Sequence, residues 1–222
     1  MARDPVPKLV KAALDLAAEH GWRDLELSAI AERAKVPLAD LVGVVAGRDD
    51  ILAHFMRRID REVIATIDPE VRSEPPRDRL FEVLMRRFEL LEPHKKALKR
   101  IAEDLSRDPG ALIVLFPQTL ASHYWMLTAA DIPADGVRGL VRAKGAALIY
   151  CAAFRVWLDD DDPGLARTMA ALDRALRRAE TWMGRAAVPI GLASAFARFA
   201  CAVIRPPRRT EPAGEGGQQG GS

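Results

Sequence analysis

Apolar residues recur along this chain every three or four positions, which is the period of an α-helix. One such face is formed near the start by Leu9, Ala12, Ala13, Leu16 and Ala17. Gly21 follows it and favours the end of a first helix there. No segment alternates polar and apolar residues convincingly, as a half-buried strand would. The pattern therefore predicts an all-α protein.

Three further helices are expected within residues 1–67. Ser28 is a suitable cap for a second helix over 29–35, and Val36-Pro37 forms a tight turn before a third over 38–45. Asp49 is placed to cap a fourth that runs to about Ile67. The prolines of the 68–76 segment then predict a hinge between a head, 1–67, and a larger body, 75–184.

Prolines also separate the longer helices expected in the body. Pro93, Pro109 and Pro133 mark three boundaries, and Pro117 is expected to bend the most apolar helix. Asp162 and Pro163 predict the start of the last body helix. Its predicted packing seam consists of Leu165, Met169, Leu172, Leu176, Ala179 and Met183.

The segment 185–205 predicts an amphipathic basic helix. Leu192, Phe196, Phe199 and Val203 fall on one face, while Arg198 and Arg205 lie away from it. An apolar face with basic flanks is typical of helices that bind anionic membrane surfaces. Packing on the body or on a dimer partner would explain the same pattern. The tail 206–222, rich in Pro, Gly, Gln and Ser, predicts disorder.

Composition narrows the class of protein. The 222 residues are 49% hydrophobic and carry a formal net charge of +2, which is typical of a globular protein. Cys151 and Cys201 are the two cysteines, and no secretory leader precedes the first helix, so we expect a cytoplasmic protein. The uncharged run 109–130 contains several polar residues and predicts a buried helix rather than a membrane span.

Candidate catalytic or metal-binding chemistry is sparse. The four histidines are scattered, no Cys-x-x-Cys occurs, and the acidic run Asp159–Asp162 lacks the Gly and final Glu of a calcium loop. We therefore predict no catalytic residue, no metal, no cofactor and no enzymatic activity.

The head resembles that of the TetR (tetracycline repressor) family. The similarity lies in Ala-Ala-Leu-Asp-Leu-Ala-Ala-Glu-His-Gly-Trp at 12–22, in Ala-Ile-Ala-Glu-Arg-Ala at 29–34, and in the turn that follows. The resemblance implies a helix-turn-helix that binds operator DNA as a two-fold homodimer. The DNA contacts would come from Lys35, Leu38, Ala39 and Arg48.

This head departs from the family pattern where DNA contacts are made. Val42 and Val44 stand where the family has an aromatic residue and a histidine, and Pro37 replaces the hydroxyl cap. Over residues 1–62, ten Lys and Arg face eleven Asp and Glu, a net charge of −1. Because duplex affinity depends largely on neutralising phosphates, weak DNA binding is expected.

A second resemblance spans more of the chain. His20-Gly21-Trp22, the segments 51–55 and 90–93, and above all 142–150, 156–163 and 168–174 are similar to the ninth Coq protein family. That family is a TetR-fold descendant that binds lipid as an accessory factor of ubiquinone biosynthesis. The resemblance implies that the protein has an apolar site for an isoprenoid, that it docks on a membrane surface, and that it has a partner enzyme. Candidate lining residues are Phe116, Leu120, Tyr124, Leu127, Leu148, Cys151, Phe154 and Trp157, with His123, Tyr124 or Tyr150 as polar anchor.

Two functional hypotheses follow. The main one is a non-enzymatic isoprenoid-binding accessory protein of ubiquinone biosynthesis, peripherally associated with the membrane. The alternative is a ligand-responsive transcriptional regulator of the TetR type. An operator fragment or an isoprenoid that co-purifies with the protein would distinguish them.

Overall fold

The computed structural model describes residues 4–183, and every regular element in that range is helical. The α-helices are α1 (Val6–His20), α2 (Leu27–Ala34), α3 (Arg48–Thr66), α4 (Pro76–Leu91), α5 (Lys95–Leu105), α6 (Pro109–Ala129), α7 (Gly136–Trp157) and α8 (Ala166–Met183). Three short 3-10 helices connect them: η1 (Leu38–Leu41), η2 (Pro69–Ser73) and η3 (Glu92–His94). The predicted all-α fold is confirmed. The expected amphipathic helix 185–205 and the tail 206–222 lie outside the described residues.

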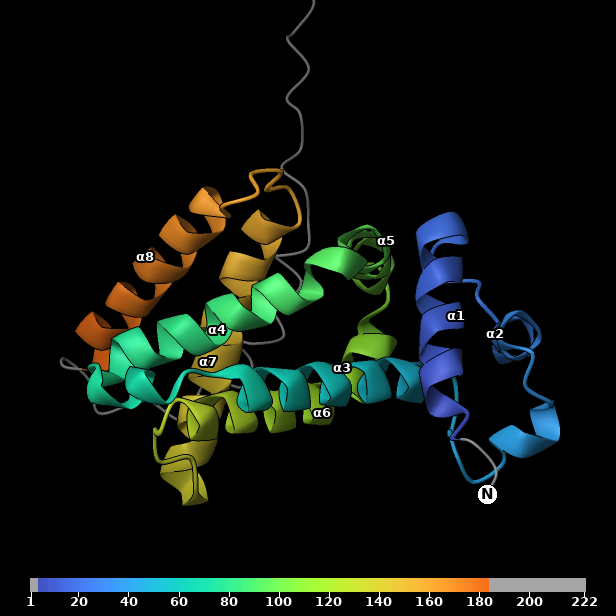
Figure 1. Ribbon diagram of the computed structural model, residues 1–222, viewed down its shortest axis with the longest axis horizontal. Coiled ribbons are helices and arrows are strands. Elements are labelled where there is room, and N and C mark those ends of the chain that lie inside the picture. Colours follow the sequence, from blue (N-terminus) through green and yellow to red (C-terminus); the bar gives the residue numbers. More distant parts are fainter. Residues whose placement is uncertain (1–3, 184–222) are drawn as a thin grey trace, which may run out of the picture.

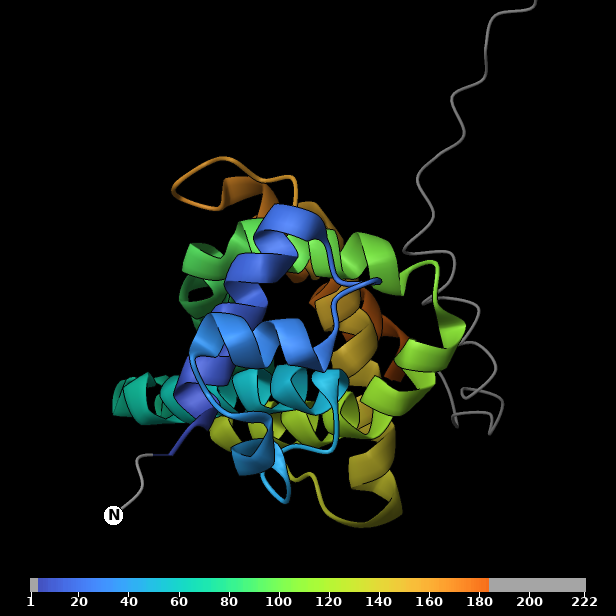
Figure 2. The same cartoon turned by 90° about the vertical axis from the view of Figure 1, so that its right-hand side faces the viewer.

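The long helix α3 joins the head to the body. In Figure 1 it runs horizontally from α1 and α2 at the right towards α7 and α8 at the left, with α6 along its lower side. Seen from the head end, α1 and α2 lie in front of the other helices (Figure 2). One helix thus begins beside the helix-turn-helix and ends in the body, and it packs on α1, α4 and α6.

Head and body share one hydrophobic core. Buried residues of α1 and α3, such as Leu9 and Phe55, belong to the same cluster as Phe88 and Trp157 of the body. A second tie is the carboxylate of Asp104 at the end of α5, which accepts hydrogen bonds from the N–H groups of Trp22 (2.6 Å) and Arg23 (3.1 Å). The head is therefore packed against α5, in addition to its covalent connection to the body through the η2 segment.

Two predicted caps in the head are wrong. The helix α2 begins at Leu27, before Ser28, and the Ser28 hydroxyl donates to the Glu26 carboxylate instead. The helix α3 begins at Arg48, so Asp49 lies inside its first turn. The third helix is also shorter than predicted, a four-residue 3-10 turn over Leu38–Leu41.

The last described helix starts later than predicted. α8 begins at Ala166, not at Pro163, because the Asp162 carboxylate accepts from the N–H groups of Gly164 and Ala166 and so forms a turn first. Leu172 and Leu176 of the expected seam are buried, as predicted, but Met169 is 39% exposed. The helix α6 continues through Pro117 without interruption.

Candidate functional site

The tip of the helix-turn-helix presents no basic side chain. Leu38 is 55% exposed and Val42 is 84% exposed, and Ala39 and Asp40 are also open to solvent. No lysine or arginine occurs between Lys35 and Arg48. The segment that would enter a DNA groove therefore offers apolar and acidic side chains.

The two basic candidates of the head lie in different settings. Lys35 is exposed and caps α2 in the left-handed conformation, with φ of 54°. Arg48 is 23% exposed in its side chain, and its Nη1 donates to the carbonyls of Trp22 (2.8 Å), Arg23 (2.7 Å) and Leu25 (3.0 Å). Its guanidinium also lies over the Trp22 ring, 5.4 Å from the centroid. The Lys35 side chain is thus accessible to a binding partner, whereas the Arg48 side chain is held by hydrogen bonds to the loop before α2.

A charged cluster is buried where α3, α4 and α6 meet. The Asp60 carboxylate accepts from Arg87 Nη1 (2.7 Å) and from the Ser122 hydroxyl (2.8 Å), and the side chains of Arg87 and Asp60 are 0% and 5% exposed. Arg87 lies on the same helical face as Leu80, Leu84 and Leu91. A buried charge of this kind is retained when it is paired and hydrogen-bonded.

An aromatic layer from α4 and α7 covers this cluster. The Arg87 guanidinium lies 5.1 Å from the Tyr150 ring, which stacks on Phe88 at 4.9 Å. Tyr150 also stacks on Phe154 at 5.7 Å, and Phe154 on Trp157 at 5.3 Å. The Arg87 guanidinium therefore lies against a set of stacked aromatic rings in the centre of the body.

Three polar atoms of the cluster have no hydrogen-bond partner among residues 4–183. They are Arg87 Nε, Tyr150 Oη and His123 Nε2. His123 Nδ1 is 2.8 Å from the Thr119 carbonyl, so Nδ1 carries the proton and Nε2 is a bare acceptor. The cluster therefore offers two donors and one acceptor around the Tyr150 ring, which lies 5.2 Å from the His123 ring.

Burial keeps His123, Tyr150 and the neighbouring Cys151 neutral at physiological pH. It lowers the pKa of His123 to about 3, with the Arg87 charge acting in the same direction. It raises the pKa of Tyr150 to about 12 and that of the Cys151 thiol to about 11, against the opposing effect of Arg87. Because Arg87 and Asp60 compensate each other, the cluster carries no net charge.

None of the eight predicted lipid-lining residues lines either of the two best-formed pockets. Leu127 and Trp157 are buried in the core, and the indole N–H of Trp157 donates to Glu92 at 2.8 Å. The Tyr124 hydroxyl donates to Asp135 at 3.1 Å, on the exposed side of α6. The other five, Phe116, Leu120, Leu148, Cys151 and Phe154, are partly buried. They come from α6 and α7, which pack on each other.

The two best-formed pockets lie elsewhere, one at the junction of the head with α5 and α6 and the other within the head, between α1 and α3. Their volumes are about 10 Å³ and 0 Å³, and residues such as Trp22, Asp104 and Phe55 line them. Sites for small molecules usually measure about 300–1,000 Å³. Neither pocket would hold a lipid.

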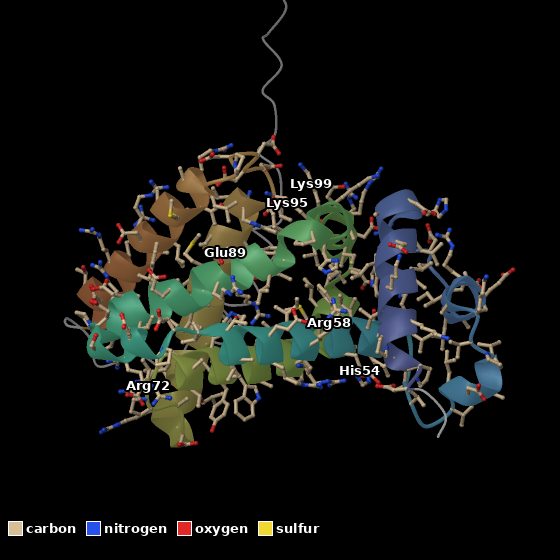
Figure 3. The ribbon with its side chains drawn as sticks, in the orientation of Figure 1. His54, Arg58, Arg72, Glu89, Lys95 and Lys99 are labelled. Atoms are coloured by element: carbon tan, nitrogen blue, oxygen red, sulfur yellow. The ribbon has the colours of Figure 1, made fainter. Side chains whose placement is uncertain are left out.

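The acidic run Asp159–Asp162 hydrogen-bonds to other groups of the protein, and the Asp159 carboxylate forms an ion pair. Lys95 Nζ donates to the Asp160 carbonyl (2.6 Å) and Lys99 pairs with the Asp159 carboxylate; Figure 3 labels both lysines on α5. The Asp160 carboxylate accepts from the N–H and hydroxyl of Thr168. Within residues 4–183 no group of three or more His, Cys, Asp or Glu side chains could hold a metal ion. No described helix is long and apolar enough to cross a membrane.

Sequence reasoning did not single out Asp60, Arg87 or Ser122. A signal for Arg87 was present, because it stands three residues after Leu84 and four after Val83, on the apolar stripe of α4. A charged residue on such a stripe indicates a buried pair. Its partner, 27 positions away on α3, has no comparable sequence signal.

Comparison with known proteins shows similarity at the level of fold. Neither a protein-family model nor a curated protein matches the sequence. A solved TetR transcriptional regulator from Nitrosomonas europaea ATCC 19718 is 18% identical, covers 80% of this chain and 98% of its own, and superposes with a TM-score of 0.61. A TetR transcriptional regulator from Rhodococcus sp. RHA1 is 20% identical, covers 79% of this chain and 95% of its own, and gives a TM-score of 0.58.

These neighbours agree with the TetR resemblance of the head and extend it into the body. The resemblance to the ninth Coq protein family receives no support from them. The chain has the all-α fold of TetR transcriptional regulators, with a helix-turn-helix head and a larger helical body.

Proposed function

We propose that this protein is a ligand-responsive transcriptional regulator of the TetR type, which binds operator DNA as a homodimer. The observation that carries the proposal is the match to two solved regulators over 98% and 95% of their lengths, so that both head and body have counterparts. This function was the alternative hypothesis drawn from the sequence. The fold match favours it over the lipid-binding hypothesis.

The DNA-contacting surface would consist of Lys35, η1 and the backbone around them. Leu38 and Ala39 are exposed and small enough to approach the thymine methyl groups of a major groove. Lys35 supplies the one basic side chain next to η1, and Arg48 holds the loop behind it. With so few phosphate contacts, affinity would be modest and would decrease only slightly as the salt concentration rises.

The buried cluster would couple the body to the head. Asp60 belongs to α3, whose first turn adjoins the helix-turn-helix, whereas Arg87 and Ser122 belong to α4 and α6. A ligand that hydrogen-bonds Arg87 Nε, Tyr150 Oη or His123 Nε2 would change the packing around this pair and shift α3. Because the cluster is neutral and lines neither of the two best-formed pockets, the ligand would be small and uncharged, or would enter as the body opens.

A selection of random duplexes by the purified protein at physiological salt tests the proposal. We expect a two-fold symmetric site, with half-sites separated by about 34 Å or a multiple of that distance, as the geometry of a dimeric helix-turn-helix requires. Lys35→Glu should remove the enrichment, and Lys144→Glu, on α7, should leave it unchanged. Recovery of no common sequence would refute the proposal.

One observation favours the lipid-binding accessory function as a second candidate. The tip of the head exposes the acidic Asp40 and Val42, which stands where the TetR family has an aromatic residue. Native mass spectrometry of protein from its own host distinguishes the candidates. A bound isoprenoid together with failure of the DNA selection would favour the accessory role in ubiquinone biosynthesis, acting at the membrane surface.

A further inference from the structure

The solvent face of α6 is an uncharged stripe. Val114, Pro117, Ala121, Trp125 and Thr128 follow one another at spacings of three and four, and all five are exposed. Val114 is 64% exposed and Trp125 is 49% exposed. Since α6 contains no Asp, Glu, Lys or Arg, no charge interrupts this stripe, which extends for about 21 Å at 1.5 Å per residue. Helices that are apolar on every side are normally covered.

The described chain ends close to one end of this stripe. Arg77 at the start of α4 contacts Asp173 (3.6 Å) in the middle of α8 and Glu180 (3.9 Å) near its end. Arg79, half a turn further on, donates to the carbonyls of Ala130 (2.7 Å) and Asp131 (3.1 Å), directly after α6. The first turns of α4 therefore connect the end of α8 with the end of α6.

Trp125 lies at this same end. Its ring packs edge-on against Tyr124 at 5.5 Å, and the Tyr124 hydroxyl reaches Asp135, just before α7. The first turns of α7 add Val137, 81% exposed, and Leu140, 46% exposed. The apolar surface is thus broadest where the chain leaves α8.

The residues after α8 carry a stripe that matches this surface. In the helix that the sequence pattern predicts there, Leu192, Phe196, Phe199 and Val203 would fall on one face and extend for about 17 Å. The connection from Met183 to Leu192 can span up to about 30 Å when extended. A tethered partner also has an effective concentration in the millimolar range, well above that of a separate molecule.

We propose that residues 190–205 bind along the α6 stripe of the same chain, with their apolar face over Trp125. The α6 stripe is the docking surface, and the C-terminal segment is its occupant. This inference does not depend on the proposed DNA-binding function. It requires only that the two apolar faces cover each other.

Tryptophan quenching by acrylamide tests the proposal in the full-length chain. Trp22 and Trp157 are 1% and 0% exposed and resist the quencher, so replacing Trp182 with Phe leaves Trp125 as the reporter. In this background we expect Phe196→Asp plus Phe199→Asp to increase the quenching constant several-fold. A chain ended after Val188 should give the same increase.

The matched control places the same two charges off the stripe. Ser194→Asp plus Cys201→Asp lie on the opposite helical face and should leave quenching at the wild-type level. Circular dichroism confirms that each variant stays folded. Equal quenching in the wild type and in the Phe196/Phe199 variant would overturn the proposal.

Two further outcomes would also overturn it. Protection of Trp125 that disappears on dilution, together with a dimer in light scattering, would identify a second copy as the occupant. Protection that develops only when anionic phosphatidylserine vesicles are added would identify the membrane as the occupant of the C-terminal segment. Protection independent of concentration, in a particle whose mass does not change, supports docking within one chain.

Discussion

Arg87 and Asp60 form an ion pair of 2.7 Å in the centre of the body, between α4 and α3, and both side chains are almost completely shielded from water. Ser122 hydrogen-bonds both partners from α6. Three helices that are distant in sequence are therefore held by one charged contact. Loss of either charge would leave the other buried and unpaired.

We predict that Asp60→Ala lowers the free energy of unfolding by about 3–5 kcal/mol, because an uncompensated guanidinium remains in the core. The double variant Asp60→Leu plus Arg87→Met should recover most of that loss, since apolar residues of similar volume often replace a buried pair without cost. Urea denaturation measures both. A loss below about 1 kcal/mol for Asp60→Ala would contradict the assigned role.

We predict that Arg48→Ala destabilises the head by about 1.5–3 kcal/mol, because three loop carbonyls lose a charged donor. The exposed Lys35→Ala should change stability by no more than about 0.5 kcal/mol. Thermal unfolding followed by circular dichroism compares the two. If the regulator proposal holds, Lys35→Ala weakens DNA binding in a fully folded protein. Equal stability of the two variants would show that Arg48 does not hold the loop.

We predict that His123 makes the protein less stable as the pH falls below about 6.5. The native pKa is lowered to about 3, so the unfolded chain takes up the proton first and stability decreases between these two values. At pH 5 the loss from this group is about 2 kcal/mol. Urea titrations at pH 7 and pH 5 should show a steeper decrease for the wild type than for His123→Leu. The same decrease in both would place the proton uptake at another group.

We predict opposite effects for two glycine substitutions. Gly21 has φ of +90°, and a Cβ there would approach Asp104 Oδ2 to 2.9 Å, so Gly21→Ala should cost at least about 1 kcal/mol. Gly145 lies inside α7, and nothing within 4 Å would meet its Cβ, so Gly145→Ala should stabilise the protein by about 0.5–1 kcal/mol. Melting temperatures of the two variants compare the effects. A Gly21→Ala variant as stable as the wild type would show that neither the φ angle nor the Asp104 contact constrains this turn.

Local sequence patterns determined the helical class and most helix boundaries of this protein. The apolar period of 3.6, Gly21 after α1, and the prolines at 93 and 109 act within one or two turns, so they can be read without knowing the partners of each helix. Capping was less predictable. Ser28, Asp49 and Asp162 all have capping chemistry, but α2 and α3 begin without a side-chain cap, and the start of each helix shifted by up to a few positions.

Tertiary structure alone decided the candidate site. The pairing of Asp60 with Arg87, the engagement of Arg48 by the loop before α2, and the absence of a lipid-sized pocket at the two best-formed cavities depend on helices packing across the chain. Sequence spacing shows that a charge such as Arg87 falls on a buried stripe, but it does not show which distant residue compensates it. That choice is made by the crossing of α3 and α4, because a buried charge is tolerated only where the fold brings an opposite charge within hydrogen-bond distance.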